Sequence, residues 1–285
     1  MEKIALITDS ICDLSKDIIK KYDIKVLPLK IIYKNREYID GVDICAEDVY
    51  AKLKIEIPTT SMPSVGEVED LYEKLVAEGY THVIGTCISS GLSGTFNNLN
   101  LVAEDFSDKI KSYIIDSLSI SKAEGELMVV AGEMIEQGKS FDEIIKVLPK
   151  CRDNIKCFFT FGTLEYLKKG GRIGKISGTI GELLNLKPIV SIDPKDGKYY
   201  TYDKVRGDKN AFNKLVSIAT DLINEGPCKV KVLHGDALPK AERLYEILGK
   251  LPNVKSIELG VLSAVAGVHS GPGFLAFGVI KDFEY

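Results

Sequence analysis

Four short segments rich in glycine and hydroxyl side chains hold the residues of this 285-residue sequence that suit contact with an anion: residues 59–64, 89–95, 170–174 and 268–273. A glycine lets the backbone approach a ligand closely, and hydroxyl groups and helix N-termini donate hydrogen bonds to negative charge. Each segment alone is a weak signal. Together they predict an anion cradle, and they imply no cofactor.

Three hydroxyl side chains in these segments fit both a binding role and a structural one. Ser93 precedes a predicted helix that begins at Thr95, and Thr60 and Ser61 precede one that begins at Val65. Serine and threonine are preferred helix N-caps, because the side-chain oxygen accepts a hydrogen bond from a free backbone N–H. Both roles therefore stay open for all three residues.

His269 is the histidine most consistent with a functional role. It stands in a predicted loop of small residues between two apolar, strand-like runs, where a lone histidine has no evident role in the core. His82 and His234 each adjoin an apolar run, and we interpret them as structural or surface residues. The three histidines are far apart and none has a second ligand at helical spacing, so no metal site is predicted.

Familiar catalytic and nucleotide-binding motifs do not fit the glycine-rich segments. Residues 91–95 read GLSGT, which does not match the GxSxG nucleophile elbow of a hydrolase. The sequence has no GxxxxGK[ST], and its GGRIGKISG segment has neither a long preceding strand nor a following acidic partner. A nucleotide site within this chain is therefore not predicted.

Composition and charge exclude several classes of protein. Hydrophobic residues make up 45% and charged residues 27%, which is typical of a folded globular chain. The net charge of −4 and the absence of a basic block argue against a nucleic-acid binder. Charged residues or glycine interrupt every apolar run, so no membrane helix or integral membrane association is predicted, and the charged start predicts no signal peptide. We expect a cytoplasmic protein whose six scattered cysteines are mostly buried free thiols.

The first half of the sequence alternates short apolar runs with segments of helical period, which is typical of an α/β domain with a largely parallel sheet. Strands are predicted at residues 3–8, 26–33, 82–88 and 110–116, and a polar, exposed loop at 58–64. Helices are predicted at residues 15–22, 47–54, 65–78, 95–105, 123–137 and 141–154.

The second half indicates a mixed sheet, because a hairpin turn at residues 195–198 joins two strand-like runs in antiparallel fashion. The fold class is therefore α/β with two domains, which we expect to span residues 1–155 and 156–285. Further strands are predicted at 156–161, 188–192, 199–206, 230–234 and on either side of 267–273, with helices at 164–169, 209–224 and 239–251.

Seven ordered segments resemble one family over essentially the whole length. They are ITDS, PTTSMPS, ISSGLSGTFNN, LEYLKKGGRIG, LKPIVSI, KVRGDKNAF and AGVHSGPGFLAFG, and their order is similar to that of the DegV family of fatty-acid-binding proteins. The resemblance implies a long-chain fatty acid as the ligand, held between the two domains with its tail in an apolar tunnel.

The resemblance also implies roles for particular residues. Ser93, Thr60, Ser61 and His269 match the family positions that lie at the fatty-acid carboxylate. Arg172, in GGRI, matches a position linked to docking of a kinase component or to phosphoryl transfer, and Arg206, in KVR, is a weaker candidate for the same role.

The family includes the acyl-carrying component of a bacterial fatty acid kinase. The resemblance therefore implies a substrate-presenting subunit of phospholipid metabolism, with no catalytic residue of its own and a separate ATP-dependent kinase as partner. Two alternatives stay open: a stand-alone lipid sensor or storage protein, and an acyl esterase that uses Ser93 and His269. Met62 stands where the family usually has glutamine, and Ser270 where threonine is common.

Overall fold

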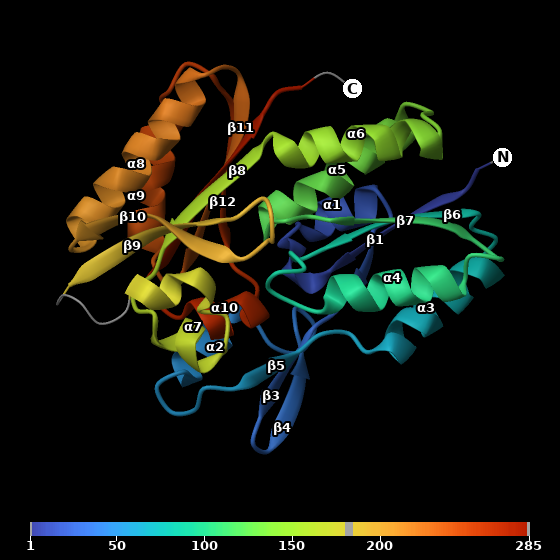
Figure 1. Ribbon diagram of the computed structural model, residues 1–285, viewed down its shortest axis with the longest axis horizontal. Helices are drawn as coiled ribbons and strands as arrows, with labels where there is room; N and C mark the ends of the chain where they lie inside the picture. Colours follow the sequence, from blue (N-terminus) through green and yellow to red (C-terminus); the bar gives the residue numbers. More distant parts are fainter. Residues whose placement is uncertain (1, 180–184, 284–285) are drawn as a thin grey trace.

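The computed structural model describes residues 2–179 and 185–283, which form two large β-sheets, one small sheet and the helices around them (Figure 1). The strands of the first large sheet all lie between residues 4 and 116, and those of the second between 155 and 281. The predicted class, α/β with one parallel and one mixed sheet, is confirmed. The predicted limits of the two domains, 1–155 and 156–285, stay a prediction.

The first sheet is entirely parallel, and helices cover both of its faces (Figure 1). Its strand order is β2 (Lys25–Leu27), β1 (Ile4–Asp9), β6 (His82–Cys87), β7 (Lys111–Asp116). Alternate residues of β1 point to opposite faces of the sheet. Leu6 therefore contacts one helix pair, whereas Ala5 and Ile7 contact the other pair. The helices are α5 (Lys122–Glu136) and α6 (Phe141–Asp153) on one face, and α3 (Val65–Ala77) and α4 (Thr95–Asp105) on the other; α1 (Lys16–Lys21) lies beside α5.

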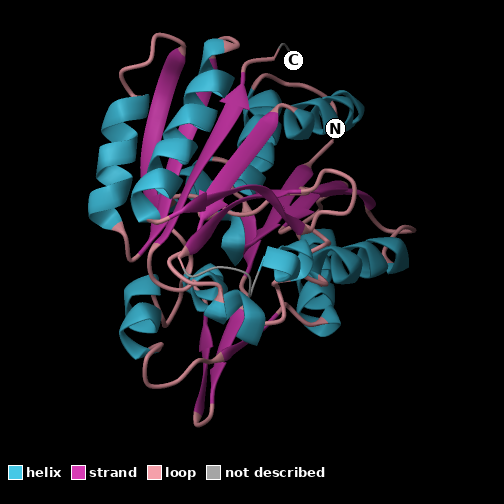
Figure 2. Cartoon of the chain, turned by 60° about the vertical axis from the view of Figure 1, so that its left-hand side comes forward, coloured by secondary structure: helices cyan, strands magenta, loops and turns pink. Residues whose placement is uncertain are grey.

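In the described part of the chain, the second sheet has six strands, and only the pair β11 and β12 is parallel. One face is covered by α8 (Asp208–Asn224) and α9 (Leu238–Leu248), as Figure 2 shows. The other face is turned toward the first half of the chain. The strand order is β10 (Tyr199–Arg206), β9 (Leu186–Ile192), β8 (Ile155–Thr160), β13 (Phe274–Lys281), β11 (Cys228–Gly235), β12 (Val254–Val261).

A small antiparallel sheet and three short helices complete the molecule at the lower edge of Figure 1. The sheet has the order β4 (Arg36–Ile39), β3 (Lys30–Tyr33), β5 (Thr59–Ser61), and the helices are α2 (Ala46–Lys52), α7 (Glu165–Lys169) and α10 (Ala264–Ser270). Two 3₁₀ helices, η1 (Ser10–Cys12) and η2 (Gly174–Thr179), lie in loops. Helix α10 contacts α2, β3 and β5, so the end of the chain packs on its beginning.

Three local predictions were wrong. The strand expected at residues 26–33 is two strands in different sheets, because Pro28 cannot donate a backbone hydrogen bond to a sheet. The loop expected at residues 58–64 contains β5, which pairs with β3. His269 lies on α10 and not in a loop between two strands.

Capping explains where several helices begin. The side chain of Ser64 accepts a hydrogen bond from the backbone N–H of Glu67, whose carboxylate accepts one from Ser64 N, a capping box at the start of α3. Ser64 therefore caps this helix, and Thr60 and Ser61 do not. At α4 the N-cap is Gly94, without a side-chain cap, which leaves Ser93 one residue outside the helix.

Candidate functional site

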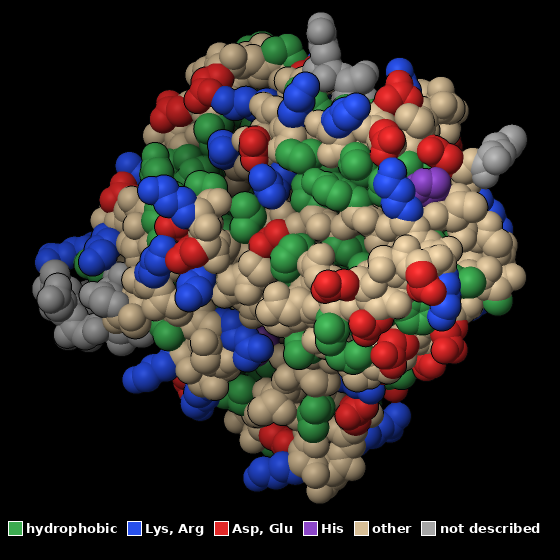
Figure 3. Space-filling view, turned by 45° about the vertical axis from the view of Figure 1, so that its right-hand side comes forward, with side chains coloured by type: hydrophobic (Ala, Val, Ile, Leu, Met, Phe, Trp, Pro, Cys, Tyr) green, Lys and Arg blue, Asp and Glu red, His purple; other side chains and the backbone are tan. Residues whose placement is uncertain are grey.

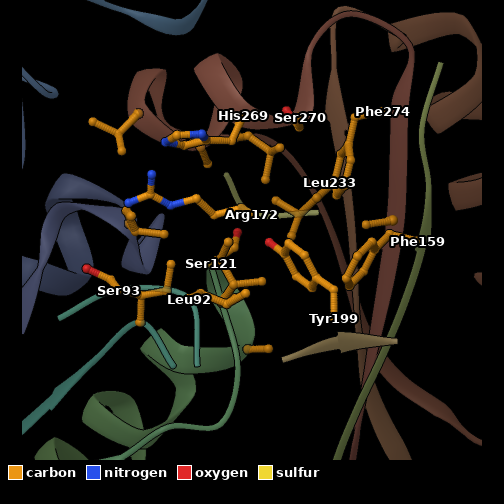
Figure 4. Close-up of a pocket in the computed structure, with 18 of the residues that line it drawn as sticks. Leu92, Ser93, Ser121, Phe159, Arg172, Tyr199, Leu233, His269, Ser270 and Phe274 are labelled. Atoms are coloured by element: carbon orange, nitrogen blue, oxygen red, sulfur yellow. The ribbon is translucent and has the colours of Figure 1, made fainter. Parts of the chain in front are cut away.

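A cavity of about 370 Å³ lies between the inner face of the six-stranded sheet and the first half of the chain. Most of its wall is apolar, and this part includes Phe159, Tyr199, Leu233 and Phe274 of the sheet and Leu92 of the loop after β6. Figure 4 shows the four sheet residues together on one side of the cavity. Pockets of this volume with an apolar lining and a few polar groups are typical of small-molecule sites.

One end of the cavity gathers the polar residues that the sequence singled out. Thr60, Ser61, Ser93 and His269 all line it, although they come from β5, the loop before α4 and helix α10. The Thr60 hydroxyl Oγ1 lies 2.8 Å from Nε2 of His269, a hydrogen bond that joins residues 209 positions apart. The structure thus brings all four predicted carboxylate-binding residues to one cavity.

His269 is uncharged at neutral pH, because desolvation, with the nearby positive charge of Arg172, lowers its pKa to about 4. Its ring lies against the backbone of Gly170, at a distance that leaves no space for a side chain there. The second ring nitrogen, Nδ1, is buried and has no hydrogen-bond partner among the described residues. The imidazole therefore acts here as a neutral hydrogen-bonding group.

Arg172 supplies the positive charge at this end of the cavity. Its guanidinium donates a hydrogen bond of 2.6 Å to the carbonyl oxygen of Gly170, and it lies below the His269 ring in Figure 4, on the same side of the cavity as Ser93. Within residues 2–179 and 185–283, no carboxylate forms an ion pair with it. A cation without a carboxylate partner at the polar end of an apolar cavity suits an anionic group.

Ser93 lines the cavity and also stabilises its own loop. Its Oγ lies 2.9 Å from Oγ1 of Thr95 and accepts a hydrogen bond from Thr95 N at 3.3 Å. Met62 also lines the cavity and contacts Gly94.

Arg206 is at the end of β10, is exposed, and is not among the residues that line the cavity. Its suggested role in docking stays a prediction. His234 is buried in β11 and His82 is half-buried beside Phe141, in agreement with their structural interpretation.

Two acidic residues bind the start of the helix that carries His269. The sequence did not suggest this role for them. Asp40 accepts hydrogen bonds from Val265 N at 3.4 Å and from the Ser10 hydroxyl at 2.7 Å. Asp13 accepts one from Ser263 N at 2.8 Å and another from the hydroxyl of Ser121, a cavity residue. These carboxylates bind the free N–H groups at the start of α10, where negative charge is favourable.

Burial affects the protonation of these acids and their neighbours. Desolvation raises the pKa of Asp13 to about 7 and those of Asp40 and Asp9 to about 6, although their hydrogen bonds oppose the rise. Glu124 is completely buried next to Asp9, and desolvation and the nearby acid raise its pKa well above the ordinary value.

No cluster of three or more potential metal ligands is present in the part of the chain that the structure describes. In the same part, no helix has both the length and the apolar character needed to cross a bilayer.

The fold and the cavity define an α/β protein with an interior cavity between a parallel and a mixed sheet. A family model with the description "Uncharacterised protein, DegV family" matches residues 3–282. A DegV domain-containing protein of Clostridium acetobutylicum is 53% identical over 281 residues, which cover 99% of this chain and 100% of the relative. The chain belongs to the DegV family.

Solved structures of similar proteins agree with this assignment. A fatty acid binding DegV family protein from Streptococcus agalactiae superposes with a TM-score of 0.92 at 33% identity, covering 99% of this chain and 100% of that one. A stearic acid-binding protein from Eubacterium ventriosum gives a TM-score of 0.82 at 30% identity, with 99% and 98% covered.

Proposed function

We propose that this protein binds a long-chain fatty acid in the cavity between its two sheets, with the carboxylate at Thr60, Ser61, Ser93 and His269. The observation that carries the proposal is that these four side chains line one mostly apolar cavity, in which Thr60 and His269 are joined by a hydrogen bond. The fatty acids named for the relatives from Streptococcus agalactiae and Eubacterium ventriosum support it.

The apolar wall provides the main driving force for binding. Burial of one methylene group contributes about 0.8 kcal/mol, so a 16-carbon tail gains on the order of 10 kcal/mol before the costs of ordering. The tail therefore supplies most of the affinity.

The polar end compensates for the desolvation of the head group. A carboxylate taken out of water loses several kcal/mol of hydration, and each charge-assisted hydrogen bond returns about 1.5 to 3 kcal/mol. Hydroxyl donors from Thr60, Ser61 and Ser93, together with the nearby guanidinium of Arg172, are suited to this task, and they fix the orientation of the ligand.

The first experiment is mass spectrometry of organic extracts of the purified protein, followed by titration of the delipidated protein with hexadecanoic acid. We expect a co-purified fatty acid, and about a tenfold weaker affinity in Ser93→Ala, because one charge-assisted bond is lost. Arg206→Gln, on the exposed surface away from the cavity, serves as the control with unchanged affinity. A protein that neither carries nor binds a fatty acid would remove the proposal.

We further propose that the bound acid is presented to a separate ATP-dependent fatty acid kinase in the cytoplasm, and that Arg172 and Arg206 contribute to docking of the kinase or to phosphoryl transfer. The support is the guanidinium of Arg172, which lies beside the proposed head group and forms no ion pair with a carboxylate of the described residues. Basic side chains are also frequent on the left half of the view in Figure 3, whereas acidic ones gather at the lower right. The division into domains 1–155 and 156–285, with the ligand between them, belongs to the same proposal.

Acyl-phosphate formation with a purified bacterial fatty acid kinase and ATP tests this second step. We expect Arg172→Ala to lower turnover by more than it lowers fatty-acid affinity. Binding without any acyl phosphate would favour the alternative of a stand-alone sensor or storage protein.

The esterase alternative has less support from the geometry. A serine nucleophile needs a base within hydrogen-bond reach. Here Ser93 Oγ interacts with Thr95 and His269 Nε2 with Thr60, so the two side chains have different partners.

A further inference from the structure

We propose that Gly278 and Lys231 form the far end of the cavity and determine which acyl chain length the protein accepts. This inference rests on the proposed fatty-acid binding and adds the residues that select among fatty acids. It follows from the register of the strands that make the floor of the cavity.

The inner face of the six-stranded sheet consists of rows of side chains that run across the strands. Side chains two residues apart on a strand point to the same face. Leu233, Ala276 and Phe159 are register partners on β11, β13 and β8, and all three line the cavity. The next row is Lys231, Gly278 and Cys157, which also line it.

The rows give the cavity a direction. Phe274, at the start of β13, lies just after α10, whose His269 belongs to the polar end. From Phe274 to Gly278 the strand advances four residues, or about 13 Å at about 3.3 Å per residue. The row that contains Gly278 is thus the part of the floor farthest along β13 from the head-group residues.

Beyond this row the cavity lining ends. The following register partners, Lys229, Ile280 and Ile155, do not line it. Gly278 has no side chain, and a Cβ placed there would meet the Lys231 Cβ at 4.0 Å, an ordinary contact. The missing side chain leaves space for the terminal methyl group of a ligand.

Lys231 forms the end wall, and ion pairs hold it in place. It is 8% exposed, its ammonium pairs with Glu258 across the strands and lies 3.7 Å from Glu126 of α5, and Glu126 also pairs with Lys229 at 2.9 Å. The salt bridges turn the charge of Lys231 away from the apolar interior and leave its methylene stem toward the ligand.

Behind Lys231 lies a second hollow, of about 330 Å³, lined by Lys229, Glu126 and Glu258 among others. Lys231 lines both this hollow and the cavity. Lys231 is the residue that the linings of the two spaces share, so its side chain lies at the boundary between them.

The test is a series of saturated acids from decanoic to docosanoic, titrated into delipidated wild-type protein and the variants Gly278→Ala and Gly278→Val. A side chain at position 278 fills the space of one or two methylene groups, and each methylene left unburied weakens binding about fourfold. We expect Gly278→Val to bind octadecanoic acid roughly 15-fold more weakly and dodecanoic acid unchanged, with Gly278→Ala in between.

Lys231→Ala tests the wall from the other side. The substitution should raise the affinity for eicosanoic and docosanoic acids relative to hexadecanoic acid. The ion pairs Glu126–Lys229 and Glu258–Lys122 remain in this variant. Circular dichroism and thermal melts check that the variants fold.

The outcomes separate this inference from the function on which it rests. If the wild-type protein binds none of the acids, the proposed function fails. If the wild-type protein binds the acids, and the Gly278→Val and Lys231→Ala variants fold but keep its order of preference for chain length, this row does not select chain length. The proposed function then stands.

Discussion

At the scale of single residues, the polar end of the cavity divides its tasks between a neutral and a charged group. His269 is a neutral hydrogen-bond partner of Thr60, because its pKa is lowered to about 4. Arg172 carries the positive charge and is a cause of that lowered pKa. The protonation of His269 and the presence of Arg172 are thus linked.

This link gives a prediction for nuclear magnetic resonance. The imidazole of His269 should stay neutral from pH 8 down to about pH 5, and Arg172→Gln should raise its pKa, because a nearby positive charge is removed. His269→Gln assigns the signal, and Arg206→Gln is the matched control that leaves the curve unchanged. A wild-type His269 that titrates near its ordinary value of 6.5 would contradict the expected burial.

Some of these residues could be predicted from the sequence and others could not. Ser93, Thr60 and His269 stand in short polar segments, where their residue types made them candidates and the family resemblance implied their role. Asp13 and Asp40 look like ordinary turn residues, because the amides they bind are 250 and 225 positions away. No local pattern carries a contact over that distance.

At the scale of elements, the loop after β6 has a second role beside lining the cavity. Ser89 Oγ donates a hydrogen bond of 2.8 Å to the carbonyl oxygen of Gly197, in the turn between β9 and β10. Gly91 lies so close to the same turn that a Cβ would meet Gly197 O at 2.6 Å. The atoms that meet here are backbone atoms of the Gly91 loop and of the turn at Gly197. Because backbone atoms cannot rotate away as a side chain can, this contact between the two halves of the chain has little freedom to adjust.

We therefore expect Gly91→Ala to lower the free energy of unfolding by about 1 to 3 kcal/mol, because the added methyl group meets backbone that cannot rotate away. Urea denaturation followed by circular dichroism measures the change. Gly66→Ala in α3 is the control: a Cβ there has nothing within 4 Å, and alanine should stabilise the helix by about 0.5 to 1 kcal/mol. A Gly91→Ala protein as stable as the wild type would show that the turn can move.

Helices with a clear period were predicted closely, and short elements were not. The helix expected at 65–78 is α3, Val65–Ala77, because its buried side chains Val68, Tyr72 and Leu75 recur with helical spacing. Strand β5 has three residues and α10 has seven, mostly small ones, so neither shows a readable period. Their structure depends on partners distant in sequence.

At the scale of the whole molecule, buried carboxyl groups make folding sensitive to pH. A carboxyl whose pKa is higher in the folded state than in the unfolded state stabilises the fold at low pH, and this stabilisation is lost as the pH rises through the folded value. Asp13 has a pKa of about 7, so its ionisation should lower the free energy of unfolding as the pH rises from about 4 to 7. His269 and His234 act in the opposite sense, since burial lowers their pKa values.

A comparison of variants isolates the contribution of Asp13. Between pH 5 and 8 the wild-type protein should lose about 2 kcal/mol more unfolding free energy than Asp13→Asn, because the amide does not titrate. Urea titrations at several pH values provide the measurement, with the exposed Asp108→Asn as the control. Parallel curves for the wild type and Asp13→Asn would mean that Asp13 is not desolvated.

The fold class could be predicted because alternating apolar and amphipathic segments determine which elements form a parallel sheet. How the two sheets face each other could not, because the contacts of α10 with α2, β3 and β5 join opposite ends of the sequence. The cavity is a product of that arrangement, so its lining became visible only in three dimensions.

Asn154 alone separates α6, the last helix of the first half, from β8, the first strand of the second half. Even so, the start of α10 in the second half binds the carboxylates of Asp13 and Asp40 in the first. If the polypeptide were severed at Asn154, each fragment would expose a surface made for the other. The amino-terminal piece would hold acids without amides, and the carboxy-terminal piece a short helix without its anchor. The two proposed domains are thus complementary, because a helix of the second is held by carboxylates of the first.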